Sequence, residues 1–164
     1  MKNFRNQVIL LTAFILSLFF ESLFWQGSLG VIKPSFLLLT FIYWNVALPD
    51  KIGLAYSFIF GFFFDLLNGN LLGIHSLAFM SVSFLSQRFF YQFRVMKKVQ
   101  QSLGVFLLSL LVNLITLSNY LGGQYVAIEF STFFYQGLIN SFINALIWTP
   151  FFYISRAYRR RFIL

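Results

Sequence analysis

The sequence predicts an all-α integral membrane protein, with residues 1–164 forming a single transmembrane domain of about six membrane-spanning helices. Of its 164 residues, 59% are hydrophobic and only 10% are charged, whereas soluble chains are about half apolar and about a quarter charged. A chain of this length cannot bury so much apolar surface inside itself, but a lipid bilayer accommodates it. The apolar residues also fall into separate runs, with basic residues clustered between them.

Six apolar runs, each ended by charged or turn-forming residues, are the candidate spans. A spanning helix needs about 20 residues, and the first, fifth and sixth runs are long enough. The second, third and fourth are shorter, so two of them remain open to a tilted, interfacial or partly re-entrant arrangement. The fourth is also open to an extension as far as Phe93. The runs cover residues 8–25, 35–48, 52–67, 71–85, 103–121 and 133–154.

The basic residues predict the orientation. With six spans and a cytoplasmic N-terminus, eleven of the 12 Lys and Arg residues fall on the cytoplasmic side, and only Lys33 falls outside. This is the bias that short loops of membrane proteins follow. One span fewer would divide the basic clusters between the two sides. We therefore expect a multi-pass protein with both termini in the cytoplasm.

The first run resembles a signal peptide, because Lys2 and Arg5 precede it. However, no small-residue cleavage site follows it, and Glu21 and Trp25 stand where such a site would lie. We therefore expect an uncleaved first helix.

A stripe of small and polar residues recurs every four positions along the third run. On a helix this spacing places its members along one side, where small residues let a second helix approach closely. One interpretation is a seam for helix packing or partner binding. The other is that the seam also holds a working acid, Asp65, although a structural or partner-binding role for this residue, as a polar contact or a helix cap, is the expected one. With its flanking residues, the stripe comprises Pro49, Gly53, Ser57, Gly61, Asp65, Gly69 and Gly73.

Three polar residues, Glu21, Asp65 and His75, are expected at similar depths in the outer half of the membrane. Asp65 follows the start of the third run by about 20 Å of helix. The three residues either meet in one polar cluster or face the lipid headgroups separately, and the sequence leaves both alternatives open.

Three asparagines lie within the fifth and sixth runs: Asn113, Asn140 and Asn144. Asn113 and Asn144 are expected near the middle of the membrane, where hydrogen bonds between helices contribute about 0.6–2 kcal/mol. A second small-residue stripe lies beside them and consists of Gly137, Ser141 and Ala145. A structural role is the expected one.

The sequence contains no motif for catalysis or cofactor binding. There is no cysteine, which excludes thiol chemistry and cysteine metal sites. His75 is the only histidine and lacks the spaced second ligand of a zinc site. We find no nucleophile motif and no phosphate-binding loop, so we expect neither an enzyme nor a cofactor.

Three segments of the sequence resemble the MreD family of rod shape-determining proteins. These are the block Lys-Pro-Ser-Phe-Leu-Leu-Leu-Thr-Phe-Ile-Tyr-Trp at residues 33–44, the Ala-Leu-Pro at 47–49, and the Gly-Phe-Phe-Phe-Asp-Leu-Leu-Asn-Gly-Asn-Leu-Leu-Gly at 61–73. The Phe93-Arg94 pair and residues 144–150 are also similar. The resemblance extends over most of the chain in size, order and expected topology.

The resemblance implies a scaffold or regulator in the bacterial inner membrane that supports lateral peptidoglycan synthesis and cell shape. The implied partners are an MreC-like protein, the MreB filament, RodA and a class B penicillin-binding protein. The family is also distantly similar to the six-helix substrate-binding subunits of energy-coupling-factor transporters. A small-molecule-binding transporter subunit is therefore the alternative function, and Glu21, Asp65 and His75 would line its pocket.

Overall fold

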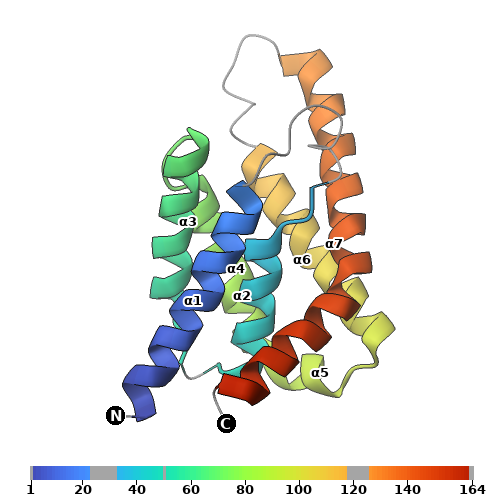
Figure 1. The fold of residues 1–164 in the computed structure, drawn as a ribbon. Coiled ribbons are helices and arrows are strands. Elements are labelled where there is room, and N and C mark those ends of the chain that lie inside the picture. The colour runs from blue at the N-terminus through green and yellow to red at the C-terminus, as the bar shows by residue number, and fades with distance from the viewer. Residues whose placement is uncertain (1, 23–32, 50, 118–125, 163–164) are drawn as a thin grey trace.

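A computed structural model describes residues 2–22, 33–49, 51–117 and 126–162, with side chains from Gln7 in the first range and from Thr132 in the last. Every regular element in these ranges is a helix (Figure 1). The helices are α1 (Lys2–Ser22), α2 (Phe36–Ala47), α3 (Leu54–Asn68), α4 (Ile74–Arg88), α5 (Phe90–Val95), α6 (Lys98–Leu117) and α7 (Val126–Phe162). The all-α prediction is confirmed for the described residues.

Each of the six apolar runs corresponds to one helix, and α5 is an additional short helix. The fourth run does not continue as one helix to Phe93, because the helix is interrupted at Phe89, between α4 and α5. By length and composition, two described segments could cross a membrane: Lys98–Leu117 and Thr132–Phe162. The apolar parts of α1, α2 and α3 are shorter. The six-span count therefore stays a prediction.

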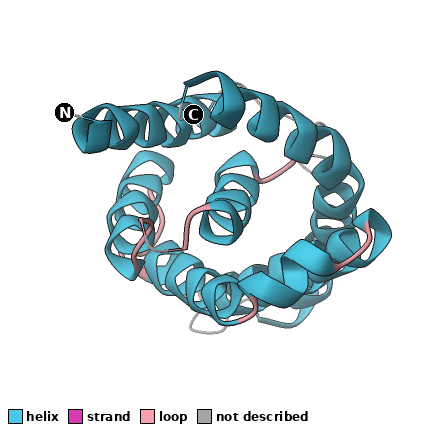
Figure 2. Cartoon of the chain, turned by 90° about the horizontal axis from the view of Figure 1, so that it is seen from below, coloured by secondary structure: helices cyan, strands magenta, loops and turns pink. Residues whose placement is uncertain are grey.

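Helix α2 lies in the middle of the bundle, and the other helices surround it (Figure 2). Its residues from Leu37 to Val46 are all buried, as expected for a helix that is apolar on every side. Twelve residues span about 18 Å, well short of a hydrocarbon layer of about 30 Å. Helix α2 is therefore a core helix covered by protein.

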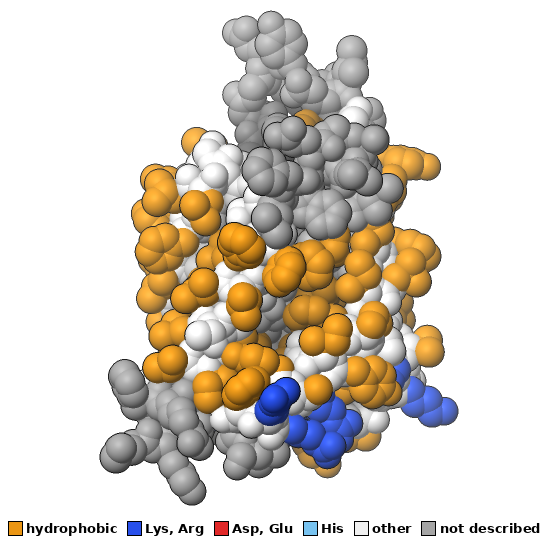
Figure 3. Space-filling view, viewed as in Figure 1, with side chains coloured by type: hydrophobic (Ala, Val, Ile, Leu, Met, Phe, Trp, Pro, Cys, Tyr) orange, Lys and Arg blue, Asp and Glu red, His pale blue; other side chains and the backbone are white. Residues whose placement is uncertain are grey.

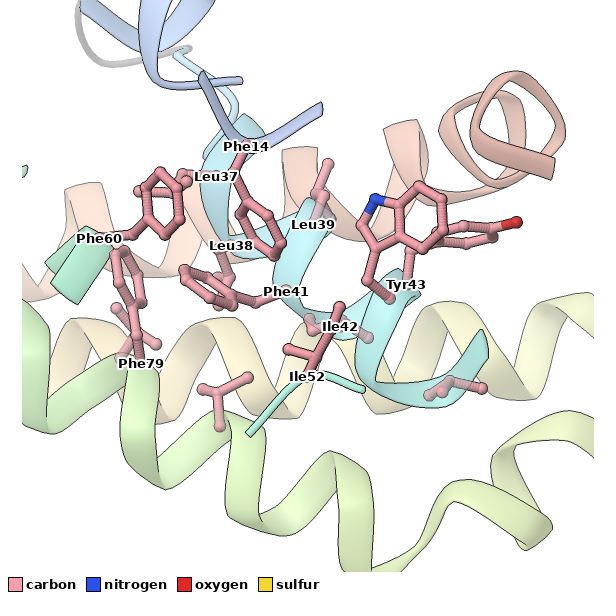
Figure 4. Packing of buried hydrophobic residues seen from close by; sticks show 14 of the residues in the cluster. Phe14, Leu37, Leu38, Leu39, Phe41, Ile42, Tyr43, Ile52, Phe60 and Phe79 are labelled. Atoms are coloured by element: carbon pink, nitrogen blue, oxygen red, sulfur yellow. The ribbon is translucent and has the colours of Figure 1, made fainter. Parts of the chain in front are cut away.

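Aromatic side chains from α1, α3 and α4 pack around Phe41 of α2 (Figure 4). The ring centre of Phe41 in α2 lies 4.7 Å from that of Phe14 in α1 and 5.2 Å from that of Phe79 in α4. The ring of Phe60 in α3 stacks on Phe14 at 4.9 Å. This cluster ties α1, α3 and α4 to the central helix.

Helix α7 is bent. It contains Pro150, which has no backbone N–H to donate and crowds the preceding turn. Figure 1 shows the last turns of α7 crossing the lower end of the bundle. The start of α1 and the end of α7 lie at this same end, where lysine and arginine side chains gather on the visible face (Figure 3).

Candidate functional site: polar and small-residue contacts between helices

The stripe on α3 packs against α4 of the same chain. A Cβ atom built on Gly61 would lie 2.5 Å from the Cα of Ser76, so only glycine permits this approach. One turn away, the hydroxyls of Ser57 and Ser83 are hydrogen-bonded, and both side chains are fully buried. The Ser76 hydroxyl donates to the carbonyl of Phe58 at 3.1 Å. Gly61 and Ser57 are thus engaged in packing within the chain.

Asp65 holds the N-terminus of α4. Its Oδ2 accepts the backbone N–H of Gly73 at 2.9 Å and that of His75 at 3.2 Å. Its Oδ1 lies 2.5 Å from Nδ1 of His75. The Asp65 side chain is completely buried, and that of His75 is 16% exposed. A carboxylate at this position accepts hydrogen bonds from N–H groups that have no partner within the helix. Its negative charge also lies at the positive end of the helix dipole, which is favourable.

The remaining members of the stripe lie at helix ends. Gly69 follows α3 with a φ of 66° and Gly73 precedes α4 with a φ of 101°, in the left-handed region that favours glycine. Gly53 is the residue before α3, with extended backbone and open space around it. Pro49 lies half-buried in the turn between α2 and α3.

Glu21 performs the same task for α2 that Asp65 performs for α4. Its side chain is buried, and its Oε2 accepts the backbone N–H of Leu37 at 2.8 Å. Each carboxylate therefore caps the helix that follows its own. Asp65 and His75 come together, whereas Glu21 makes its hydrogen bond at a different helix end.

Two asparagines of α7 hold the segment that leads into α2. Asn144 accepts the backbone N–H of Ser35 at 2.8 Å and donates to the Ser109 hydroxyl at 3.2 Å. Asn140 donates to the carbonyl of Lys33 at 2.5 Å. The start of α2 is thus fixed from both sides, by α1 through Glu21 and by α7 through these amides.

Asn113 joins α6 to α7. Its amide donates to the carbonyl of Gly137 and to the hydroxyl of Ser141, both at 3.0 Å. A Cβ atom on Gly137 would lie 3.1 Å from that of Asn113, so this member of the second small-residue stripe also provides close helix contact.

A polar network near the C-terminal end of α2 was not predicted from the sequence. Asn45 is fully buried; its amide donates to the Ser83 hydroxyl at 2.9 Å, and its carbonyl accepts from Gln87 at 2.9 Å. Gln87 also donates to the carbonyl of Ile52. The isolated asparagine within an otherwise apolar run was a signal that could have identified it.

These contacts define a class of protein: a bundle of helices, two of them long and apolar enough to cross a membrane, whose interior polar groups hold the helices together. In the described part of the chain, no group of three or more His, Cys, Asp or Glu residues is placed to bind a metal ion. The carboxylates of Glu21 and Asp65 are both occupied by backbone N–H groups. The arrangement is suited to stabilising helix packing.

Comparison with known proteins identifies the family. The sequence profile of the family described as rod shape-determining protein MreD matches residues 1–158, so the chain belongs to the MreD family. Rod shape-determining protein MreD of Haemophilus influenzae is 27% identical over 156 residues, covering 93% of this chain and 91% of that protein. Rod shape-determining protein MreD of Bacillus subtilis is 33% identical over 60 residues, 37% of this chain and 35% of that protein. No solved structure matches significantly. Membership of this family indicates a role in rod shape determination.

Proposed function

We propose that this chain is a non-enzymatic scaffold or regulator of the cell-elongation complex in the bacterial inner membrane. In this proposal it binds an MreC-like protein, within a complex that also holds the MreB filament, RodA and a class B penicillin-binding protein. It thereby supports lateral peptidoglycan synthesis. The observation that carries the proposal is the family match over residues 1–158.

The use of the polar residues supports a scaffold. Glu21 and Asp65 bind helix ends, and Asn113 and Asn144 join α6 to neighbouring segments. Large apolar side chains remain exposed on the outer sides of α1, α3 and α6, for example Phe19, Phe63 and Leu107. Such surfaces suit contact with lipid and with the membrane helices of partner proteins.

A small-molecule-binding transporter subunit is the alternative function. It would require Glu21, Asp65 and His75 to face a shared pocket. Because both carboxylates already accept backbone hydrogen bonds, binding a ligand through them would require breaking these caps. This favours the scaffold over the transporter subunit.

Two measurements on the purified protein separate these functions. The scaffold predicts that a tagged copy retains an MreC-like protein through mild-detergent purification. The transporter subunit instead predicts that a vitamin from a panel raises the unfolding temperature by several degrees. A vitamin-dependent shift without a retained partner would contradict the proposal.

A further inference from the structure

A pocket of about 420 Å³ lies at the lower end of the molecule, between α2, α5 and α7. The last turns of α7, the helix that contains Pro150, cross this end of the bundle (Figure 1). Its walls combine aromatic and basic side chains: Tyr43, Arg94, Trp148, Phe152, Arg156 and Arg159.

The α7 side of the pocket changes in character along the helix. Its four lining residues are spaced four, four and three positions apart, so they share one side of the helix. Trp148 is fully buried and Phe152 half-buried, whereas Arg156 is exposed. The pocket is therefore aromatic at its inner end and basic towards the end of α7.

The arginines lack an acidic partner among the described side chains. The whole chain has only four Asp and Glu residues. The two whose side chains the structure describes, Glu21 and Asp65, bind the N-termini of α2 and α4. Arg156 also lies close enough to Lys98 for their like charges to interact. The local excess of positive charge favours an anion.

Tyr43 supplies an unused hydrogen-bonding group in the same pocket. Its side chain is only 3% exposed, yet its hydroxyl has no hydrogen-bond partner among the described residues. The ring packs against Phe152 with 5.6 Å between ring centres, and both Arg156 and Arg159 lie near enough to interact with it electrostatically. Buried hydroxyls are seldom left unpaired, so a ligand atom is the natural partner.

Arg94 provides a fixed wall. Its Nε donates to the carbonyl of Val46 at 2.7 Å, and one terminal nitrogen donates to that of Ala47 at 2.9 Å. These bonds hold the guanidinium against the end of α2. Since a guanidinium carries five N–H donors, it retains others for a ligand.

We propose that this pocket binds the phosphate group of an anionic phospholipid at the basic end of the protein. Guanidinium groups pair well with phosphate oxygens, and the Tyr43 hydroxyl donates to a further oxygen. The inner end is lined by Trp148 and Phe152, and the ammonium of Lys98 lies 3.1 Å from the centre of the Phe152 ring, which adds a further cation beside the arginines. Basic pockets between membrane helices are known to bind such headgroups.

The test uses the full-length protein, purified in detergent and stripped of lipid. Binding of phosphatidylglycerol, phosphatidylcholine and inorganic phosphate is measured by native mass spectrometry and by the shift in unfolding temperature. The pocket variant is Arg156→Gln with Arg159→Gln. The matched control is Arg160→Gln with Arg161→Gln, which removes the same charge from exposed positions of the same helix. Tyr43→Phe removes only the unpaired hydroxyl.

We expect the wild type and the control to bind phosphatidylglycerol in preference to phosphatidylcholine. The double pocket variant should bind it about tenfold or more weakly, because charge-assisted hydrogen bonds are lost. Tyr43→Phe should weaken binding about three- to tenfold. Monodisperse elution and an unchanged helical circular-dichroism spectrum show that each variant is folded.

Three results would overturn the proposal. Equal loss of binding in the pocket variant and the control would indicate general attraction to the basic end. Inorganic phosphate that binds as tightly as phosphatidylglycerol would assign the pocket to a free anion. Retention of an acidic partner protein that depends on Arg156 and Arg159, without retained lipid, would assign it to protein recognition.

Discussion

At the scale of single residues, Gly61 has the closest neighbouring backbone of the described glycines. The backbone of α4 lies where its side chain would be, at 2.5 Å from a built Cβ atom. This close approach is made within the chain, between consecutive helices. Bulk at Gly61 is therefore expected to damage the protein itself, and any loss of a partner would follow from that damage.

Gly61→Ser and Gly53→Ser test this as a matched pair. Both add the same side chain, but the nearest atom to a Cβ on Gly53 is the backbone N of Ala55, at 4.0 Å, and serine is favoured as the residue before a helix. We expect Gly61→Ser to cost about 1–3 kcal/mol, as overpacking does, and Gly53→Ser to be neutral or slightly stabilising. Unfolding in detergent measures both, and equal stability of the two variants would refute the close packing.

Asp65 gives a second prediction at this scale. Asp65→Ala leaves the buried N–H groups at the start of α4 without an acceptor, which costs about 1–3 kcal/mol, whereas Asp65→Asn keeps one acceptor oxygen. We therefore expect Asp65→Asn to be the milder change, in both unfolding temperature and membrane abundance. If Asp65→Asn abolished function at normal abundance while Gly61→Ser was tolerated, the charge would matter in itself, and the ligand or ion interpretation would gain.

At the scale of elements, α2 depends on its neighbours for its position. It is short and apolar, and the segment leading into it is held by Glu21 from α1 and by Asn140 and Asn144 from α7. At its other end, Arg94 of α5 binds the carbonyls of Val46 and Ala47. Four anchoring side chains thus compensate for a helix too short to be positioned by the membrane alone.

Asn144→Ala tests this anchoring. It removes the acceptor for the Ser35 N–H and the donor to Ser109, so we expect a loss of about 1–3 kcal/mol and faster amide exchange at the start of α2. Asn68→Ala is the control, because among the described residues that amide donates only to the carbonyl of Phe64 in its own helix, and it should change stability by less than about 0.5 kcal/mol. Similar effects from both variants would contradict the anchoring role.

At the scale of the whole molecule, the positions of the helices could be predicted but much of their arrangement could not. Apolar runs locate α1 to α4, α6 and α7, because helices that cross a membrane are predominantly apolar. The apolar run of α2 does not reveal that this helix is central, since a core helix and a lipid-facing helix are both apolar. The spacing of Gly61 and Asp65 predicts a seam, but it does not say which helix fills it.

The orientation of the molecule is a further prediction at this scale. The start of α1 and the end of α7 lie at one end (Figure 1), and basic residues dominate it. Reporter fusions after Lys98 and at the C-terminus should therefore read cytoplasmic, and fusions near residues 30, 70 and 124 should read outside. The sites near 30 and 124 lie outside the described residues, so the reporters provide independent information. An external C-terminus would contradict six spans.

In the proposed function, this chain supports rod shape by binding an MreC-like partner. The most direct test expresses it in cells depleted of their own copy, and measures cell width together with the partner retained on the purified protein. We expect this chain to restore rod shape and to retain the partner. The Gly61→Ser variant should reduce both rod shape and partner retention in proportion to its loss of folded protein. Rods restored by a chain that retains no such partner would contradict the proposed function.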